Sequence, residues 1–396
     1  MSEKVLGFRD YLRLSEMKVA LISLAHCVND MYAAFLATFI PFIKDNLGLS
    51  YTLASNFNVI VGIFHIICQP VIGYMCDRIR RPLLMMIGPV FCGLGAVMVP
   101  NARSYGAAVF FAGLWGFGSA LYHPQGTGGV GYVSKPEHLT RSLTWFNIAG
   151  TVGTMLSPII AVGTVKALGY KGLLVTLVPA LLLAPLIYFS MPFLRDEELA
   201  SDKRRKGFFK TIGALFAVLY PVWGVSLIRD SLFQCMRFFL PLKIAARGGN
   251  LESVGTIVFC LTLGSTLAMI PMGAAAKRFG NKRALQGSMI LGAVILLTAA
   301  FTTDFLSVVL DVLGISCIYS TLPLTVVVAQ TLAPTERSAA SSIVMGLSWG
   351  VSNILVAPFG KLADTMGLDA TFVFLAVLPI LGMPFFWARA FKKLAN

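Results

Sequence analysis

Long apolar segments alternate with short polar ones along the whole chain. Twelve apolar runs can be counted, at approximately residues 18–43, 53–75, 83–100, 105–132, 140–165, 172–193, 211–242, 253–275, 285–302, 305–331, 338–359 and 370–390. A bilayer core needs roughly 20 apolar residues per helix, and these runs nearly exhaust the chain. The pattern therefore predicts an all-α polytopic membrane protein with twelve transmembrane helices and no soluble domain.

The second half of the chain resembles the first. The longest predicted cytoplasmic connection lies at the midpoint of the 396 residues, with six runs on either side. At an offset of 200 positions, identical residues coincide: Asp30 with Asp230, Pro41 with Pro241, Gly73 with Gly273, Arg78 with Arg278 and Pro158 with Pro358. Two pseudo-symmetric halves are typical of secondary transporters, whose substrate site lies near mid-membrane. We predict an N-terminal half at 1–193, a linker at 194–210 and a C-terminal half at 211–396.

Composition agrees with a membrane protein, since 57% of the residues are hydrophobic and the mean hydropathy is +0.78. The net charge of +14 could suggest nucleic acid, but topology explains it. With a cytoplasmic N-terminus, cytoplasmic segments hold 23 of the 32 Lys and Arg residues, and helix seven holds two. The external loops hold the other seven, Lys44, Arg103, Lys166, Lys171, Lys243, Arg247 and Lys361. This bias predicts both termini in the cytoplasm, and no nucleic-acid partner is expected because no single basic face is indicated.

Ionisable residues inside the apolar runs mark a candidate site. A charge near the bilayer centre costs roughly 2.5–3.5 kcal/mol on insertion scales, so it is rarely kept without a partner or a purpose. Helix one carries Ser23, His26 and Asp30 on one face, as their helical spacing requires. A second stripe on helix seven contains Ser226, Asp230, Gln234 and Arg237. We expect Asp30, Asp230 and His26 to couple transport to protons.

The arginines of helix seven have two interpretations. Arg229 lies about 100° around the helix from Asp230, so we expect it to reach an acid on a neighbouring helix, with Asp30 as the first candidate. In one interpretation Arg229, Arg237 and Gln234 bind an anionic substrate. In the other, the arginines form fixed ion pairs with Asp30 and Asp230 that hold the two halves in register.

Three histidines, His26, His65 and His123, lie in predicted helices and can titrate near neutral pH. We expect His123 and the neighbouring Gln125 to contact substrate, although a hydrogen-bonded packing role is the alternative for each histidine. The histidines are too dispersed for a zinc cluster of the usual spacing. No metal site is predicted.

One motif points to a cofactor only superficially. Gly126, Gly128 and Gly131 match the GxGxxG fingerprint, which binds dinucleotides only after a β-strand and at the start of a helix. Here the motif lies within an apolar run, where small residues favour close helix packing. We therefore expect no cofactor, and in the absence of any nucleophile–base pair we expect no enzymatic activity.

The loop from Gly73 to Arg81, GYMCDRIRR, resembles the loop 2–3 signature of the major facilitator superfamily, and the resemblance covers the whole chain. Three shorter stretches, HCVND, QPVIGYMCD and ALYHPQG, resemble the fosmidomycin-resistance branch of drug exporters. The resemblance implies gating roles for Gly73, Asp77, Arg78 and Arg81, with Asp77 and Arg78 as a latch on the cytoplasmic side. It has two departures: Tyr122 stands where many members have arginine, and Ser157 where glycine is usual.

The resemblance implies secondary active transport by alternating access in the bacterial inner membrane. The expected activity is proton-coupled export of a small anionic or amphipathic compound of the drug or antibiotic type. The alternative is import or exchange of a small organic anion or metabolite. One chain already contains both halves, so a monomer is expected to suffice.

Overall fold

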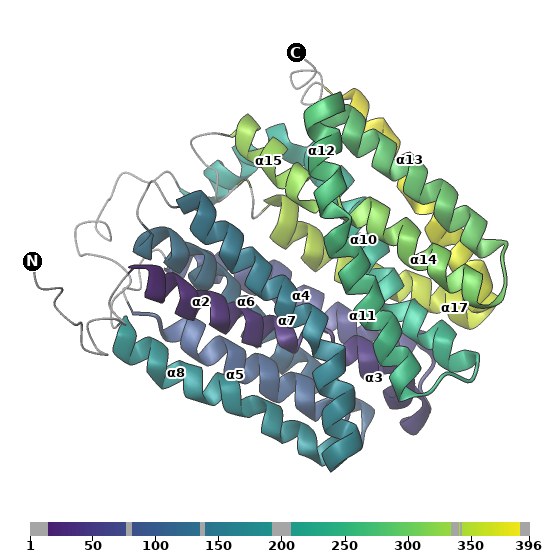
Figure 1. Cartoon of the computed structure of the whole chain (residues 1–396), viewed down its shortest axis with the longest axis horizontal. Helices are drawn as coiled ribbons and strands as arrows, with labels where there is room; N and C mark the ends of the chain where they lie inside the picture. Colours follow the sequence, from purple (N-terminus) through teal and green to yellow (C-terminus); the bar gives the residue numbers. More distant parts are fainter. Residues whose placement is uncertain are drawn as a thin grey trace, which may run out of the picture. The chain divides into compact units, whose positions relative to one another are not determined.

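The structure is a computed structural model that describes residues 15–76, 81–134, 139–191, 207–333, 340 and 343–388. Helices account for nearly all of these residues, and no strand occurs among them (Figure 1). Asp77 and Arg78, two of the predicted gating residues, lie outside the described residues. The all-α prediction is confirmed.

Contacts divide the chain into two compact units. The first contains the described residues within Met1–Leu36 and Ile67–Arg205, and the second those within Ala37–Ile66 and Lys206–Asn396. Residues 37–66 therefore group with helices from the second half of the chain, and the division between the units falls inside one helix, Tyr51–Cys76.

The helices before residue 191 are α2 Ser15–Met31, α3 Phe35–Asn46, α4 Tyr51–Cys76, α5 Leu83–Met98, α6 Tyr105–Val133, α7 Leu139–Leu168, the 3-10 helix Tyr170–Leu177 and α8 Val178–Ser190. In the first unit, α2 packs against α6, α7 and α8, and α5 packs against α6 and α8 (Figure 1). This arrangement surrounds α2, which carries His26 and Asp30, with neighbours on several sides.

The helices after residue 206 are α10 Phe208–Ala246, α11 Leu251–Leu267, α12 Met269–Phe279, α13 Asn281–Ala300, α14 Asp304–Tyr319, α15 Leu322–Leu332, the π-helical turn Ile343–Leu347, α17 Ser348–Val377 and the 3-10 helix Leu378–Trp387. In the second unit α10 packs against α11, α14 and α17. The long helix α10 carries the second polar stripe of the sequence.

In the part of the chain that the structure describes, each of the twelve predicted runs lies largely in helix. Within the described residues, nine helical stretches are long and apolar enough to cross a membrane. The last of these, Ile343–Trp387, contains two of the predicted runs, because the positive φ of 85° at Gly367 breaks the helix inside it. The two runs outside the nine are α5, which is shorter, and α6, whose Gly, His and Gln residues lower its mean hydropathy.

The break in the first helix does not coincide with its proline. Helix α2 ends at Met31 and α3 begins at Phe35. Pro41 lies further on, inside α3. At the break the hydroxyl of Tyr32 donates to the carbonyl of Thr176, at 2.8 Å. Helix α10 likewise continues through Pro221 and Pro241. The break places Asp30 in the last turn of α2.

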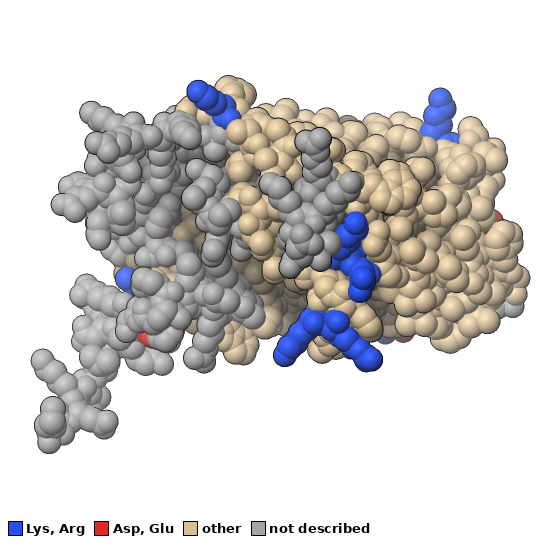
Figure 2. All heavy atoms as spheres, turned by 90° about the horizontal axis from the view of Figure 1, so that it is seen from above, with Lys and Arg blue, Asp and Glu red and all other residues tan. Residues whose placement is uncertain are grey.

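The described surface is largely apolar. Exposed large side chains include Ile67, Phe189, Phe209, Phe301 and Phe305. Uncharged atoms make up most of the described surface in Figure 2, with Lys and Arg side chains at a few places. So much exposed apolar surface is not typical of a soluble monomer and fits a lipid environment.

Candidate functional site

Helix α2 holds a histidine and an aspartate in contact. The Nε2 atom of His26 lies 3.1 Å from Oδ2 of Asp30, one helical turn further on. The other ring nitrogen of His26, Nδ1, lies 2.8 Å from the carbonyl oxygen of Phe146 on α7. The ring of His26 is also stacked on that of Phe146, with centroids 4.0 Å apart and 18° between the planes. The imidazole is therefore fixed in position and in orientation.

These contacts determine where hydrogens lie on His26. A carbonyl oxygen can only accept, so Nδ1 carries a hydrogen and donates it to Phe146. The lone pairs of Nε2 and of a carboxylate oxygen would repel at 3.1 Å, so a second proton must lie between His26 and Asp30. This proton belongs either to an imidazolium that faces a carboxylate or to a carboxylic acid that faces a neutral imidazole. The pair is thus a site for one shared proton.

Helix α6 adds a second histidine to the pair. Nε2 of His123 lies 3.5 Å from Oδ1 of Asp30, and the amide of Asn29 donates to the same oxygen at 3.0 Å. His26 is buried, whereas the Asp30 and His123 side chains keep 16% and 21% of their surface exposed. Asp30 and His123 are therefore the more accessible members of this cluster.

The expectation that the histidines are too dispersed for a zinc cluster is wrong for His26 and His123. The rings of His26 and His123 lie edge to face with centroids 5.3 Å apart, although 97 positions separate them in the sequence. Ligand atoms of His26, Asp30 and His123 lie within 4.8 Å of one another, a spacing that could also suit a metal ion. One proton shared between His26 and Asp30 accounts for their 3.1 Å contact, so this contact does not require a metal ion.

Two glycines on α7 allow this helix to approach α2. A Cβ atom on Gly150 would lie 2.5 Å from Cε1 of His26, and one on Gly153 would collide with the carbonyl of Cys27. Thr154, one turn beyond Gly150, donates to the backbone carbonyl of Asp30 at 3.4 Å. The close approach is what brings the Phe146 carbonyl within reach of His26.

Gly150→Ala is expected to lower the melting temperature of the purified protein by several degrees and to reduce transport, because overpacking costs about 1–3 kcal/mol. Gly163→Ala on the same helix is the matched control. A Cβ at Gly163 has no neighbour within 4 Å, and replacing a helical glycine in open space stabilises by about 0.4–1 kcal/mol. Equal melting temperatures for the two variants would contradict the tight packing at Gly150.

Helix α10 holds a second enclosed ion pair. Nε and Nη2 of Arg229 donate to the two carboxylate oxygens of Asp230, at 2.8 and 2.9 Å. Nη1 of Arg229 donates to the hydroxyl of Thr325 at 2.6 Å. Neither member of the pair is more than 1% exposed. The expectation that Arg229 pairs with an acid on another helix is wrong, because its long side chain folds back onto the next residue.

This geometry favours the ion-pair interpretation for Arg229, since the guanidinium is enclosed and bonded inside the protein. Gln234 and Arg237 also lie on α10 and are half-buried. Because Arg229 is buried, Gln234 and Arg237 are the more accessible of the predicted substrate-binding residues on α10. On the same helix, Ser231 donates to Ser352 of α17 at 3.2 Å.

Gln125 contacts the protein backbone. Its carbonyl oxygen accepts from the N–H of Met85 at 2.8 Å, and its amide nitrogen donates to the carbonyl of Arg81 at 3.0 Å. Gln125 is buried and thereby attaches α6 to the residues that begin α5. The side chain of Arg81 is exposed, and Gly73 lies in the last turn of α4. Gln125 thus supports the segment that carries the predicted gating residues.

A third charged pair, which the sequence patterns do not predict, joins α10 to α14. Nζ of Lys243 lies 2.7 Å from Oδ2 of Asp311 on α14, and both side chains are at most 4% exposed. Lys243 was expected in an external loop, but α10 extends to Ala246 and includes it. An acid in the apolar run 305–331 was the signal that could have revealed the pair.

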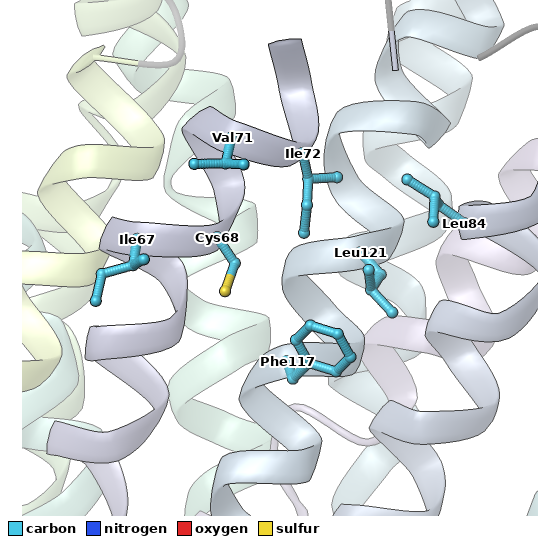
Figure 3. A pocket seen from close by; sticks show the side chains of 7 residues that line it. All are labelled: Ile67, Cys68, Val71, Ile72, Leu84, Phe117 and Leu121. Carbon is cyan, nitrogen blue, oxygen red and sulfur yellow. The ribbon is translucent and has the colours of Figure 1, made fainter. Parts of the chain in front are cut away.

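One cavity of about 300 Å³ in the first unit is lined by Ile67, Cys68, Val71, Ile72, Leu84, Phe117 and Leu121 (Figure 3). These residues come from α4, α5 and α6, and none is charged. An anionic substrate would find no partner there. The stretch Gly126–Gly131 lies within α6, so the helical position predicted for the GxGxxG match is confirmed.

The fold and the enclosed ionisable residues on its apolar helices define a polytopic membrane transporter. The family model of the Major Facilitator Superfamily matches residues 22–242 and 222–395. The chain belongs to this superfamily. Members of the family are transporters, so the expectation that the chain is no enzyme is confirmed.

Relatives with curated descriptions cover nearly the whole chain. An uncharacterized MFS-type transporter, YfnC, of Bacillus subtilis is 26% identical over 94% of this chain and 93% of its own. The fosmidomycin resistance protein of Escherichia coli is 24% identical over 91% and 90%. The hexuronate transporter of Escherichia coli is 22% identical over 97% and 94%.

Solved structures agree on the fold. A bacterial homolog of the human lysosomal transporter Spinster, in an inward-facing and unoccupied conformation, has a TM-score of 0.74 with 13% identity. The match covers 100% of this chain and 98% of that chain. The major facilitator fold predicted from the sequence is confirmed.

Proposed function

We propose that the protein is a proton-coupled secondary transporter that exports a small anionic or amphipathic compound by alternating access. The observation that carries the proposal is the shared-proton pair of His26 and Asp30, which lies on an apolar helix next to the partly exposed His123. A group that holds one proton inside a membrane helix is a natural coupling site. The two repeat halves, 1–193 and 211–396, are the parts that alternate.

The pair also suggests how a proton could control movement. With the proton present, His26 and Asp30 attract each other at 3.1 Å. When the proton leaves, two acceptors face each other, and either the Asp30 side chain or α2 must move to relieve the repulsion. The groups around Asp30 that interact with its charge include His26, Cys27 and Asn29 on α2, His123 and Tyr122 on α6, and Cys92 on α5. Helix α7 contributes the uncharged Phe146 and Thr154.

The cluster of His26, Asp30 and His123 and the ion pair of Arg229 and Asp230 suggest different roles. His26, Asp30 and His123 form the proton site, and His123 is the member placed to contact substrate as well. Asp230 is held by Arg229, so this pair anchors the second unit. Arg237 and Gln234 are the α10 residues that we propose for substrate, with Arg237 supplying the positive charge for an anion. Arg81 and Gly73 belong to the cytoplasmic gate, together with the residues 77 and 78 outside the described ranges.

The direction of export rests on the likeness to the fosmidomycin resistance protein. The proposed location is a bacterial inner membrane with both termini in the cytoplasm, as the distribution of Lys and Arg favours. A second candidate function is import or exchange of a small organic anion. The likeness to the hexuronate transporter over nearly the whole chain favours this alternative.

A flux measurement separates the two functions. Purified protein is first screened for compounds that raise its melting temperature, and the best compound is then followed in right-side-out and everted vesicles under an imposed pH gradient. We expect accumulation in everted vesicles only, and we expect it to disappear when an ionophore collapses the gradient. Accumulation in right-side-out vesicles would instead support import, and flux independent of the gradient would contradict proton coupling.

A further inference from the structure

An aspartate on α17 binds the first turn of α4. The carboxylate of Asp364 accepts from the backbone N–H groups of Tyr51 and Thr52 at 2.7 and 2.8 Å. It also accepts from the hydroxyl of Thr52 at 2.5 Å. These residues are more than 300 positions apart in the sequence and belong to the same unit. Hydrogen bonds to a charged acceptor are about twice as strong as neutral ones.

Helix α4 does not need Asp364 in order to form. Ser50, directly before the helix, accepts from the N–H of Leu53 at 3.1 Å through its side chain, and its carbonyl accepts from Ala54 at 3.0 Å. Ser50 is thus a local N-cap, which already satisfies part of the first turn. The bonds to Asp364 therefore serve the contact between α4 and α17.

Small residues bring the two helices together below this contact. A Cβ on Gly360 would lie 2.7 Å from Oγ of Ser55 and 2.9 Å from the carbonyl of Tyr51. Further along, a Cβ on Gly62 would lie 2.6 Å from the carbonyl of Gly350. Residue numbers rise along α4 as they fall along α17, so the helices pack antiparallel over this stretch. The two helices thus approach closely at two places, and the aspartate lies beside the one nearer the start of α4.

We propose that Asp364 is a latch that holds the external side of the transporter closed, through its bonds to Tyr51 and Thr52. Helix α4 runs from Tyr51 to Cys76 and is followed by the basic loop that ends at Arg81, so Tyr51 lies at the membrane face opposite to that loop. By the positive-inside rule this face is external. The inference rests on the proposed alternating-access function, in which the external side has to open during each cycle.

The place of α4 in the chain explains why the latch has to break. The part of α4 up to Ile66 groups with α17, whereas the part from Ile67 groups with α5 and α6 in the first unit. By sequence, however, α4 belongs to the repeat half 1–193 and α17 to the half 211–396, so the bonds to Asp364 join the two parts that are proposed to alternate. Release of Asp364 frees the first turn of α4, and the local cap at Ser50 keeps that turn helical.

Thiol labelling tests the latch without substrate or gradient. Ser55 is fully buried beside Gly360, so a cysteine at this position reports separation of α4 from α17. Ser55→Cys is introduced into a chain whose seven native cysteines are replaced by alanine, and labelling by a membrane-impermeant maleimide is timed from the external side. Adding Asp364→Ala is expected to speed labelling by about tenfold, within the range typical of a conformational coupling.

Two further variants give the test its controls. Thr52→Val removes the bond from the Thr52 hydroxyl and keeps the side-chain shape, so labelling should fall between that of the parent and that of Asp364→Ala. Asp369→Asn makes the same change of charge at an exposed position just beyond the break at Gly367 and should label as the parent does. Labelling of Asp364→Ala at the parental rate, or an equal increase in Asp369→Asn, would overturn the latch. Faster labelling in a protein that shows no flux would instead preserve the latch and reject the transport proposal.

Discussion

An Asp30→Asn variant is expected to fold and to bind substrate, but its transport under a pH gradient should fall to the level of protein-free vesicles. The amide of asparagine can donate to Nε2 of His26, just as the shared proton now fills the 3.1 Å between His26 and Asp30. The variant therefore mimics the protonated site permanently. It has no proton to release, and a proton gradient can no longer drive net movement.

Exchange of substrate across the membrane is a second readout for this variant. Exchange needs alternating access but no net proton movement, so Asp30→Asn should retain it while losing gradient-driven accumulation. Asp45→Asn is the matched control, because Asp45 is 74% exposed beside Lys44 and surface ion pairs contribute little. Undiminished gradient-driven transport by Asp30→Asn would reject Asp30 as the proton carrier. Loss of exchange together with accumulation would indicate a structural role instead.

The helices and the contact between His26 and Asp30 can be predicted from the sequence, because both depend on local spacing along the chain. Apolar runs of sufficient length predict membrane helices whatever their neighbours are. His26 and Asp30 are four positions apart on one helix, so their contact is set by helix geometry alone. The roles of Phe146 and Gly150 depend on how α7 packs against α2, and no pattern within α7 reveals that contact.

The charged residues on α10 show where local reasoning fails. The angular separation of Arg229 and Asp230 describes their Cα–Cβ directions, but the long guanidinium side chain can bend back to reach both carboxylate oxygens. Lys243 was placed outside the membrane because the apolar run ends before it, yet a buried acid on α14 makes a helical position favourable. In both cases the partner decides the position of the charge. A hydropathy pattern shows neither the bend of a long side chain nor a partner on another helix.

Lys243 and Asp311 are expected to stabilise the protein only as a pair. Their charged atoms lie 2.7 Å apart in a buried environment, and Nζ of Lys243 is also 4.1 Å from the ring centroid of Phe372. Removing one partner leaves the other charge buried and uncompensated, which costs about 3–5 kcal/mol. Replacing both with apolar residues of similar volume removes the charges together and is often neutral.

Thermal unfolding of four variants in detergent checks this expectation. Lys243→Met and Asp311→Val should each lower the melting temperature markedly, whereas the double variant should regain most of the loss, as a non-additive cycle between contacting residues. Arg247→Ala is the control, because this arginine is exposed one turn after Lys243 and donates at 3.2 Å to Ser307. A change in an exposed polar contact of this kind should have a small effect. If Lys243→Met proved as mild as Arg247→Ala, or if the two single losses simply added, the pair would not be the buried, mutually dependent contact that its geometry indicates.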